Sequence, residues 1–400
     1  MDAQRSEVLI AGGGPTGMVL AYALALRGVS VRLIEETTDC AEDMRASTIH
    51  PPTQAMLAEL GLMDELLPMG IKAPLYQYYN TSTDVGFELD LTEIADVTPF
   101  PWRLQCEQFK LVRVIRAKLD AMPNVEAIFG ARVLAFDQGA DGVTVHCETP
   151  MEVKSYSAQY LVGADGASST VRKWLRSEFD GFTYPEYFLT LSTEYPIEDY
   201  LPWLKGVNYI ASPPAWGVIL RVPQFWRVLV PVSPDTPEAD LLSDARKDAV
   251  FAQLLGPHAP PMVTHHRTVY RVHQRVAKTF RHGRVLLAGD AAHLNNPLGG
   301  FGMNSGIHDA WNLKDKLIAI LRDGGDADAL LGRYERQRRT INREFVQTQT
   351  IANKKALEGE DGFREREALL DRLTKDADAR RAYLLEQGMF GCLEREKQIE

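Results

Sequence analysis

Three glycines spaced as Gly12-x-Gly14-x-x-Gly17 lie between a short apolar run, Glu7–Ala11, and a stretch rich in Ala and Leu at residues 15–27. The apolar run predicts a strand, and the following stretch predicts a helix. In such a unit the first glycine permits a tight turn, the second lets a phosphate approach the backbone, and the third lets the helix pack against the strand. The free N–H groups at the helix N-terminus favour an anion. This beginning therefore predicts an α/β fold with a phosphate site beside its first strand.

A second strand is predicted at residues 30–34, and it ends at Glu35, about 20 residues past the glycine loop. An acidic side chain at this position accepts hydrogen bonds from the two hydroxyls of an adenosine ribose. A glycine triplet alone also occurs in purely structural turns, but with the flanking strand, helix and acidic end it predicts a dinucleotide site. Besides the glycines, the residues expected to contact the nucleotide are Pro15, Thr16, Glu35 and Glu36. They do not distinguish FAD from NAD.

A second glycine-rich signature, Gly289-Asp290-Ala291-Ala292-His293, follows another predicted buried strand at residues 284–288. Asp290 is placed to accept hydrogen bonds from the ribitol hydroxyls of a flavin, and NAD has no ribitol. The alternative is a plain Gly/Pro connection between a strand and a helix. The signature favours FAD, with Gly289 and Asp290 as contacts, and His293 is expected to be a packed residue rather than a proton-transfer group.

The loop from Pro297 to Gly302 suits a close approach of the backbone to a cofactor, and a long helix is predicted after it, from Asn304 to Leu321. The first N–H groups of that helix would point out of the loop. A reduced flavin carries negative charge at its N1/C2 carbonyl region, and a helix N-terminus stabilises such charge by on the order of 1 kcal/mol. The residues expected to contact the flavin here are Pro297, Gly300, Gly302, Met303 and Asn304.

These motifs resemble the class A, single-component FAD-dependent aromatic hydroxylases built like p-hydroxybenzoate hydroxylase, and the resemblance covers nearly the whole chain. A third family motif, residues 164–172, lies between a predicted strand at 158–163 and a short helix. The resemblance implies that Asp165 lies near the flavin, that Arg45 faces the cofactor and that Gln105 contacts FAD. Without the resemblance, Arg45 and Gln105 would be expected to be ordinary surface residues.

Three further segments, at residues 51–53, 270–275 and 296–300, look most similar to 4-nitrophenol 4-monooxygenases and 6-hydroxy-3-succinoylpyridine hydroxylases. In that subgroup the attacked ring carbon already carries a leaving group, so the product loses a nitro or acyl-type substituent. Simple ring hydroxylation stays equally open. One departure is the segment 311–316, which replaces a more apolar family pattern, so helix packing is expected to differ there.

The resemblance implies a reaction in which NADH or NADPH reduces the FAD, O2 adds at flavin C4a, and the hydroperoxide transfers its distal oxygen to a phenol or hydroxypyridine. The ring must be ionised, which requires a base or a proton path to solvent. His273, Tyr209 and Tyr78 are candidates for this base from segment position, each with a structural role as the alternative. The residues expected to serve catalysis are Pro297, Arg227 and His273. The main alternative is an FAD-dependent reductase or dehydrogenase of the same fold that does not insert oxygen.

The predicted fold class is α/β, with a Rossmann-like FAD-binding domain of the p-hydroxybenzoate hydroxylase type, an interleaved mixed β-sheet substrate domain and C-terminal helices. Strands at 216–222 and 226–232 are predicted to form a hairpin, and alternation allows an arginine of this hairpin to face the ring pocket. Arg227 resembles a family position near the flavin and Arg221 is a looser candidate, and an exposed salt-bridging role is the alternative for either. The expected boundaries are 1–71, 104–180 and 281–345 for the FAD-binding domain, 72–103 and 181–280 for the substrate domain, and 346–400 for the helical segment.

The net charge of −10 and the lack of a basic run with interleaved aromatics argue against nucleic acid as a partner. No apolar stretch reaches the roughly 18 residues of a membrane span. The four cysteines show no metal-ligand spacing, and the adjacent His265 and His266 would point to opposite faces of a strand, so no metal is expected. We therefore expect a cytoplasmic monomer or homodimer that acts on a small aromatic substrate with O2.

Overall fold

An eight-stranded sheet forms one part of the computed structural model, which describes residues 5–40, 42, 44, 46–212, 215–256 and 259–400. Its order is β17-β18-β11-β1-β2-β8, with β10 paired to β11 and β9 to β10, and the strands from β18 to β8 are parallel. The four strands predicted for this sheet are confirmed to within a few residues, β11 being longer than expected. The strands are β1 (Ser6–Ala11), β2 (Val31–Glu35), β8 (Val125–Phe129), β9 (Arg132–Gln138), β10 (Val143–Glu148), β11 (Val153–Gly163), β17 (Arg281–His282) and β18 (Val285–Leu287).

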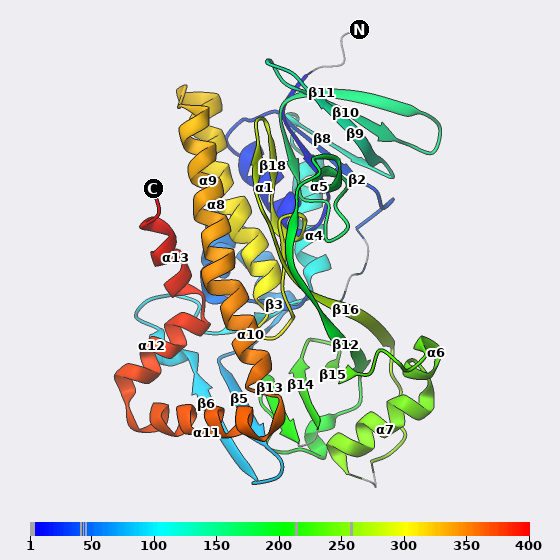
Figure 1. Cartoon of the computed structure of the whole chain (residues 1–400), viewed down its shortest axis with the longest axis vertical. Coiled ribbons are helices and arrows are strands. Elements are labelled where there is room, and N and C mark those ends of the chain that lie inside the picture. The colour runs from blue at the N-terminus through cyan, green and yellow to red at the C-terminus, as the bar shows by residue number, and fades with distance from the viewer. Residues whose placement is uncertain (1–4, 41, 43, 45, 213–214, 257–258) are drawn as a thin grey trace.

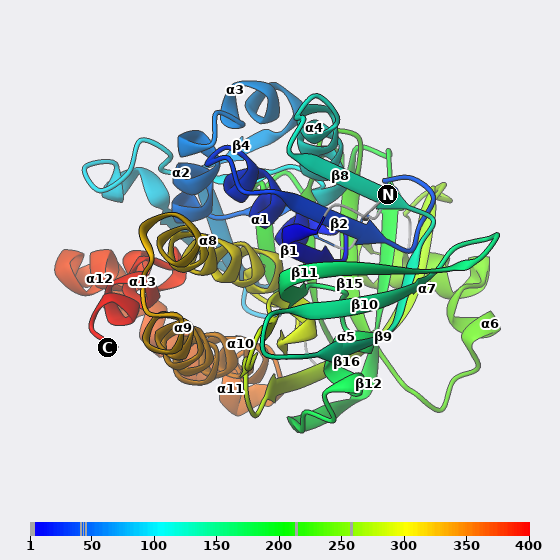
Figure 2. The same ribbon diagram turned by 90° about the horizontal axis from the view of Figure 1, so that it is seen from above.

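Two helices from opposite ends of the sequence, α1 (Pro15–Ala25) and α8 (Phe301–Asp323), pack against each other beside this sheet (Figures 1 and 2). Glycine permits the approach, because a Cβ added at Gly306 would lie 2.4 Å from Thr16 Oγ1. α8 begins three residues before the predicted Asn304, since Gly300 already ends the loop in the left-handed conformation (φ 72). The other elements around the sheet are α2 (Pro51–Glu59), α3 (Met63–Leu66), η1 (Leu67–Met69), α4 (Gln108–Asp120), α5 (Thr170–Trp174), η4 (Gly289–Ala291) and α9 (Ala327–Ile341).

A second eight-stranded sheet has the order β19-β16-β12-β15-β14-β13-β5-β6, and only β13 and β5 run parallel in it. Its long strands β12 and β16 pair with each other and reach up beside the first sheet (Figure 1). The strands are β5 (Leu75–Asn80), β6 (Val85–Asp90), β12 (Phe179–Thr193), β13 (Val207–Ser212), β14 (Ala215–Arg221), β15 (Trp226–Val232), β16 (His266–Ala277) and β19 (His293–Leu294).

The predicted hairpin is confirmed as the antiparallel pair β14–β15, in which Leu220 lies opposite Arg227. One face of this pair packs its apolar residues, Ile219 among them, against Val250 and Phe251 of α7 (Asp244–Leu255), which follows α6 (Glu238–Leu241). Arg221 lies on that face by alternation, with its guanidinium 5.5 Å from the centroid of the Trp226 ring. The prediction that Arg221 could face the ring pocket is therefore wrong, because α7 covers its side of the sheet.

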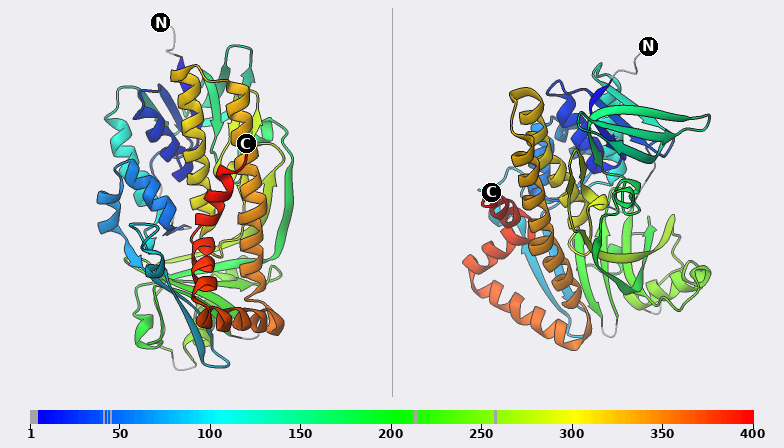
Figure 3. Two further views of the ribbon diagram at one scale, coloured as in Figure 1. Left: turned by 90° about the vertical axis from the view of Figure 1, so that its left-hand side faces the viewer. Right: turned by 45° about the horizontal axis from the view of Figure 1, so that its top comes forward.

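A small three-stranded sheet links the larger parts, with the order β3-β7-β4. The strands are β3 (Thr48–Ile49), β4 (Ile71–Ala73) and β7 (Arg103–Gln105), and the 3-10 helix η2 (Leu91–Ile94) packs near β4. A further 3-10 helix, η3 (Ile197–Asp199), packs on the α7 side of the second sheet. The last part of the chain is helical, as predicted, and packs along the flank of the molecule, α12 on η2 and α13 on α9 (Figure 3). Its elements are η5 (Asn342–Gln347), α10 (Thr348–Lys355), α11 (Gly359–Lys375), α12 (Ala377–Gln387) and α13 (Phe390–Lys397).

Within the described ranges, no helix has both the length and the apolar character needed to cross a membrane. All four cysteines carry free thiols and are buried. The predicted domain boundaries stay a prediction.

Candidate active site

A cleft of about 840 Å³ runs from the ends of the parallel strands to one face of the second sheet. Its lining residues come from segments far apart in the sequence, among them parts of 11–16, 34–37, 46–48, 103–112, 129–133, 164–173, 207–229, 270–273 and 290–303. The residues predicted to bind a cofactor that do line it are Gly12, Gly14, Pro15, Thr16, Glu35, Glu36, Asp165, Asp290, Pro297, Gly300, Gly302 and Met303. The fold therefore brings both glycine-rich signatures to one cleft.

The glycine loop between β1 and α1 is shaped by close backbone approaches. Gly12 has φ 108, and a Cβ added to it would lie 2.2 Å from the carbonyl oxygen of Ala164. A Cβ at Gly17 would lie 2.0 Å from the carbonyl oxygen of Gly12, so Gly17 lets the helix sit on the loop without lining the cleft itself. Gly14 has open space around it and begins α1 without a side-chain cap. The first N–H groups of α1 are therefore left for an anion in the cleft.

Glu35, at the end of β2, is fixed against this glycine loop. Its Oε2 accepts a hydrogen bond from the backbone N–H of Gly13 (2.6 Å), and its Oε1 accepts from the N–H and the hydroxyl of Thr37 (2.9 and 2.8 Å). Oε1 thus uses both of its lone pairs on Thr37, and Oε2 keeps one to accept from a hydroxyl in the cleft. The neighbouring Glu36 is exposed at the same edge.

Asp165 organises the loop that leads from β11 into α5. Its carboxylate accepts hydrogen bonds from the hydroxyl of Ser169 (2.5 Å) and from the N–H of Val171 (3.0 Å). Burial raises the pKa of Asp165, although these hydrogen bonds act in the opposite direction. The side chain thus holds the loop at the cleft wall.

The second glycine-rich signature lies next to the first, since a Cβ added at Gly289 would lie 2.6 Å from Thr16 Oγ1. Asp290 is exposed toward the cleft, directly after Gly289 (φ 61). Farther along, the loop ends with Gly299 and Gly300, both at positive φ, and α8 starts with no side-chain cap. Its first N–H groups therefore have no intrahelical partner, and Gly302 and Met303 of that turn line the cleft.

Two residues predicted to touch the cofactor lie behind the cleft wall. Asn304 is buried and clamps α8 to β3, donating to the carbonyls of Thr48 (2.8 Å) and Gly300 (2.7 Å) and accepting from the N–H of His50 (2.9 Å). Gln105 is buried and accepts from the hydroxyl of Thr48 (3.0 Å). Its amide nitrogen has no partner among the described residues, so its contact with a cofactor stays a prediction. Arg45 lies outside the described residues.

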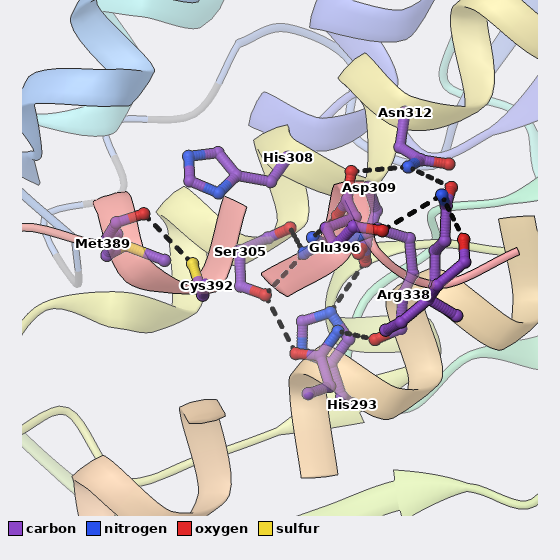
Figure 4. Close-up of polar contacts among 12 residues, drawn as sticks. His293, Ser305, His308, Asp309, Asn312, Arg338, Met389, Cys392 and Glu396 are labelled. Atoms are coloured by element: carbon purple, nitrogen blue, oxygen red, sulfur yellow. Dashed lines mark hydrogen bonds and ion pairs between the residues drawn. The ribbon is translucent and has the colours of Figure 1, made fainter. Parts of the chain in front are cut away.

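A buried ion network holds the second signature from behind (Figure 4). Asp309 is fully buried and accepts hydrogen bonds from Arg338 Nε (2.6 Å), from His293 Nε2 (2.7 Å) and from the N–H of Gly289 (2.9 Å). Arg338 also pairs with Glu396 of α13. Burial alone would raise the pKa of Asp309, but its interactions with His293 and Arg338 hold it at about 2. His293 is thus a packed residue, as predicted, and the network reaches from the Gly289 turn to the last helix.

The second sheet closes the other end of the cleft with apolar side chains and two buried arginines. Arg227, on β15, lines it as predicted and lies 3.3 Å from the hydroxyl of Ser47 through Nη1. Arg103, on β7, also lines it and was missed by sequence reasoning, since nothing in the local pattern marks it as buried. The apolar lining residues at this end include Val207, Val218, Leu220, Leu229 and Leu298.

Of the three candidates for the base, His273 and Tyr209 line the cleft and Tyr78 does not. His273 lines the cleft, half-buried, with Nδ1 2.8 Å from the hydroxyl of Thr183; burial and two neighbouring arginines lower its pKa. Tyr209 lines the cleft as well, and its ring stacks on that of Tyr78 at 4.9 Å. Tyr78 is buried behind it, and burial raises its pKa well above the ordinary value. The geometry keeps His273 and Tyr209 as candidates and removes Tyr78 from the cleft surface.

Known proteins share this arrangement. Residues 5–349 match the family described as FAD binding domain. The chain is 32% identical over 351 residues to para-nitrophenol 4-monooxygenase of Pseudomonas sp. (strain WBC-3), which covers 86% of each chain. It is 31% identical over 347 residues to 6-hydroxy-3-succinoylpyridine 3-monooxygenase of Pseudomonas putida (strain DSM 28022 / S16), again 86% of each.

Among solved structures, the crystal structure of p-nitrophenol 4-monooxygenase from Pseudomonas putida DLL-E4 superposes with a TM-score of 0.90 at 32% identity, covering 96% of this chain and 98% of that one. The resemblance stated from the motifs, down to its subgroup, is therefore confirmed. The chain belongs to the FAD-binding domain family and is an FAD-dependent monooxygenase.

Proposed function

We propose that this enzyme hydroxylates the ring of a phenol or hydroxypyridine, using FAD, O2 and NADH or NADPH. The observation that carries the proposal is the continuous cleft, which joins two glycine-rich phosphate and flavin signatures to an apolar chamber holding buried arginines. The relatives act, by their names, on para-nitrophenol and on 6-hydroxy-3-succinoylpyridine, both of which are hydroxylated aromatic rings.

The residues of the cleft fit FAD. The glycine loop leaves open space where a Cβ of residue 14 would stand, and two uncapped helix N-termini offer N–H groups to the pyrophosphate and to the flavin ring. Glu35 would accept from a ribose hydroxyl, Asp290 from the ribitol, and Pro297 to Met303 would border the ring. When bound and reduced, the flavin supplies the activation of O2 for oxygen transfer.

The protein itself contributes orientation, charge and exclusion of water. The apolar walls keep water from the reacting ring, which strengthens every electrostatic contact inside. Arg227 and the α8 N-terminus bring positive charge to the place where negative charge develops. His273, neutral near pH 7 because its pKa is lowered, is the group we propose to take the proton of the substrate hydroxyl.

The mass of the product distinguishes simple ring hydroxylation from hydroxylation that displaces a ring substituent. Purified holoenzyme is given a panel of substituted phenols and hydroxypyridines, while NAD(P)H loss, O2 uptake and product mass are followed together. Insertion adds one oxygen to the substrate mass, and displacement exchanges a substituent for oxygen. NAD(P)H consumption without an oxygenated product from any ring would refute the proposal in favour of a reductase.

Replacing Asp290 with alanine tests the flavin end of the cleft. The variant removes a charged acceptor at the proposed ribitol position, so we expect folded protein with FAD affinity lowered about 10- to 100-fold, as for one charge-assisted hydrogen bond. Flavin absorbance after gel filtration measures the bound fraction. Asp315→Ala, an exposed carboxylate on α8, is the control. Full flavin content and normal turnover in Asp290→Ala would remove this role.

We further infer a cytoplasmic enzyme, acting as a monomer or homodimer, because four buried free thiols fit a reducing compartment. The division into an FAD-binding part at 1–71, 104–180 and 281–345 and a substrate part at 72–103 and 181–280 is proposed with it. Separate stabilisation of the first part by FAD in proteolysis experiments would support this division.

A further inference from the structure

Arg103 is a buried cation that has no counter-ion among the residues that the structure describes. It is 2% exposed, lines the cleft from β7, and takes part in no salt bridge within the described residues. Its Nη1 donates to the hydroxyl of Tyr209 at 3.3 Å, and its guanidinium lies 4.1 Å from the centroid of the Tyr76 ring. Its Nε is buried and has no hydrogen-bond partner in the described part of the chain. Two contacts therefore stabilise the positive charge of Arg103 in the described part of the chain: a long hydrogen bond to Tyr209 and the face of the Tyr76 ring.

Two other buried arginines, Arg338 and Arg366, make more polar contacts than Arg103. Arg338 is fully buried and pairs with two carboxylates, Asp309 and Glu396. Within the described ranges Arg366 of α11 also has no carboxylate partner, but it donates to the hydroxyl of Tyr383 (2.7 Å) and the side chain of Asn353 (3.4 Å) and does not line the cleft. A buried charge is costly unless it is paired, and an arginine that is left underpaired at the wall of a binding cleft invites an anion.

The surroundings of Arg103 say what kind of anion fits. The carboxylates of the cleft, Glu35, Glu36, Asp165 and Asp290, all lie on the segments proposed to hold the nucleotide. The chamber beside Arg103 is walled by the aliphatic residues of β13, β14 and β15, which suit a planar ring. The Tyr209 hydroxyl, next to Nη1, is a second polar group able to contact the same atom.

We propose that Arg103, assisted by Tyr209, is the counter-cation that binds an ionised oxygen of the aromatic substrate. This rests on the proposed function and deepens it, because it limits the substrate to a ring that carries a phenolate or carboxylate oxygen. An Arg–oxyanion contact would also favour the ionised ring that oxygen transfer requires.

The test uses 4-nitrophenol, whose visible absorption reports its own ionisation, bound to oxidised FAD holoenzyme. In the wild type we expect the pKa of the bound phenol to fall by about one unit or more, a tenfold shift in its ionisation equilibrium. Arg103→Met should reverse that shift and raise the Kd at least about tenfold, whereas Arg103→Lys, which keeps the charge, should recover part of both. Neutral 4-nitroanisole should bind equally to all three proteins.

Arg221→Met is the matched control, because Arg221 lies on the covered face of the same sheet and should leave Kd and bound pKa unchanged. A second experiment repeats the binding measurement with 4-hydroxybenzoate. If Arg103→Met loses binding of 4-hydroxybenzoate but not of 4-nitrophenol, Arg103 binds a carboxylate. If it loses binding of 4-nitrophenol but not of 4-hydroxybenzoate, Arg103 binds a phenolate. Equal binding of both anions to wild type and Arg103→Met overturns the assignment.

Two outcomes keep the test decisive if Arg103→Met does not fold. The wild type alone must show either a lowered pKa of bound 4-nitrophenol or tighter binding of 4-hydroxybenzoate than of its neutral methyl ester, and the absence of both overturns the proposal. Failure of the proposed function is distinguishable, since it would appear as no oxygenated product from any ring. Failure of this inference would appear as oxygenation that proceeds with neither of these two signs of an anion site.

Discussion

Replacing Asp309 with asparagine should show how strongly the buried ion network supports the fold. The substitution keeps the size of the side chain but leaves the Arg338 guanidinium, fully buried, with only one of its two carboxylates. Breaking a buried pair on one side costs about 3–5 kcal/mol. A pKa held at about 2, against roughly 3.9 for an unfolded Asp, corresponds to about 2–3 kcal/mol, the same order.

The sign of the pH dependence follows from that lowered pKa. The contribution of Asp309 is fully present above about pH 4 and is lost as the pH falls through about 2, so Asp309→Asn should lack this acid limb. Denaturant unfolding at saturating FAD, so that ligand linkage is held fixed, gives the free energy of unfolding.

Asp315→Asn is the control for this measurement, since Asp315 is an exposed partner of Lys314 and should change the free energy of unfolding by no more than about 0.5 kcal/mol. FAD affinity provides a second readout, because Asp309 fixes the N–H of Gly289 (2.9 Å) directly before Asp290. Destabilisation of Asp309→Asn by less than about 1 kcal/mol would refute the reasoning.

Two other predictions concern a glycine pair and a lysine. Gly12→Ala should destabilise the protein by about 1–3 kcal/mol, because its Cβ would strike the Ala164 carbonyl. Gly14→Ala, whose Cβ has open space, should keep the fold and weaken only FAD binding. Equal midpoints of the two variants in denaturant unfolding would contradict this. Lys316, whose pKa burial lowers to about 8, should titrate near that pH by NMR of its side chain, and a midpoint near the ordinary value of about 10.4 would show that the amine is solvated.

The parts of this molecule that sequence could predict are those fixed by local chemistry. Gly12 and Gly17 were assigned their steric roles from spacing alone, and the structure has backbone oxygens where a side chain would stand. The strands β1 and β2 and the β14–β15 hairpin follow from short-range patterns of apolar residues and turns. These features depend on residues that are close in sequence, so no tertiary information is needed.

The sequence could not predict features whose position depends on the packing of elements that are distant in the chain. Alternation grouped Arg221 with Ile219 correctly, but which face meets the cleft depends on where α7 packs. The start of α8 turns the side chain of Asn304 onto β3, while the contact predicted between Asn304 and the cofactor stays a prediction. Arg103 gave no signal at all, because its burial is produced by Tyr76 and by other residues brought from distant strands.

The packing of α1 against α8 affects the order in which the protein folds and binds FAD. The two helices are separated by most of the chain, and Thr16 fits against Gly289 and Gly306 only when both have docked. Contacts between such distant segments carry the loop-closure entropy of everything between them, and they form slowly. We therefore expect FAD to bind late during refolding, after α1 and α8 have docked. A chain in which the two helices have not yet docked lacks a complete FAD site.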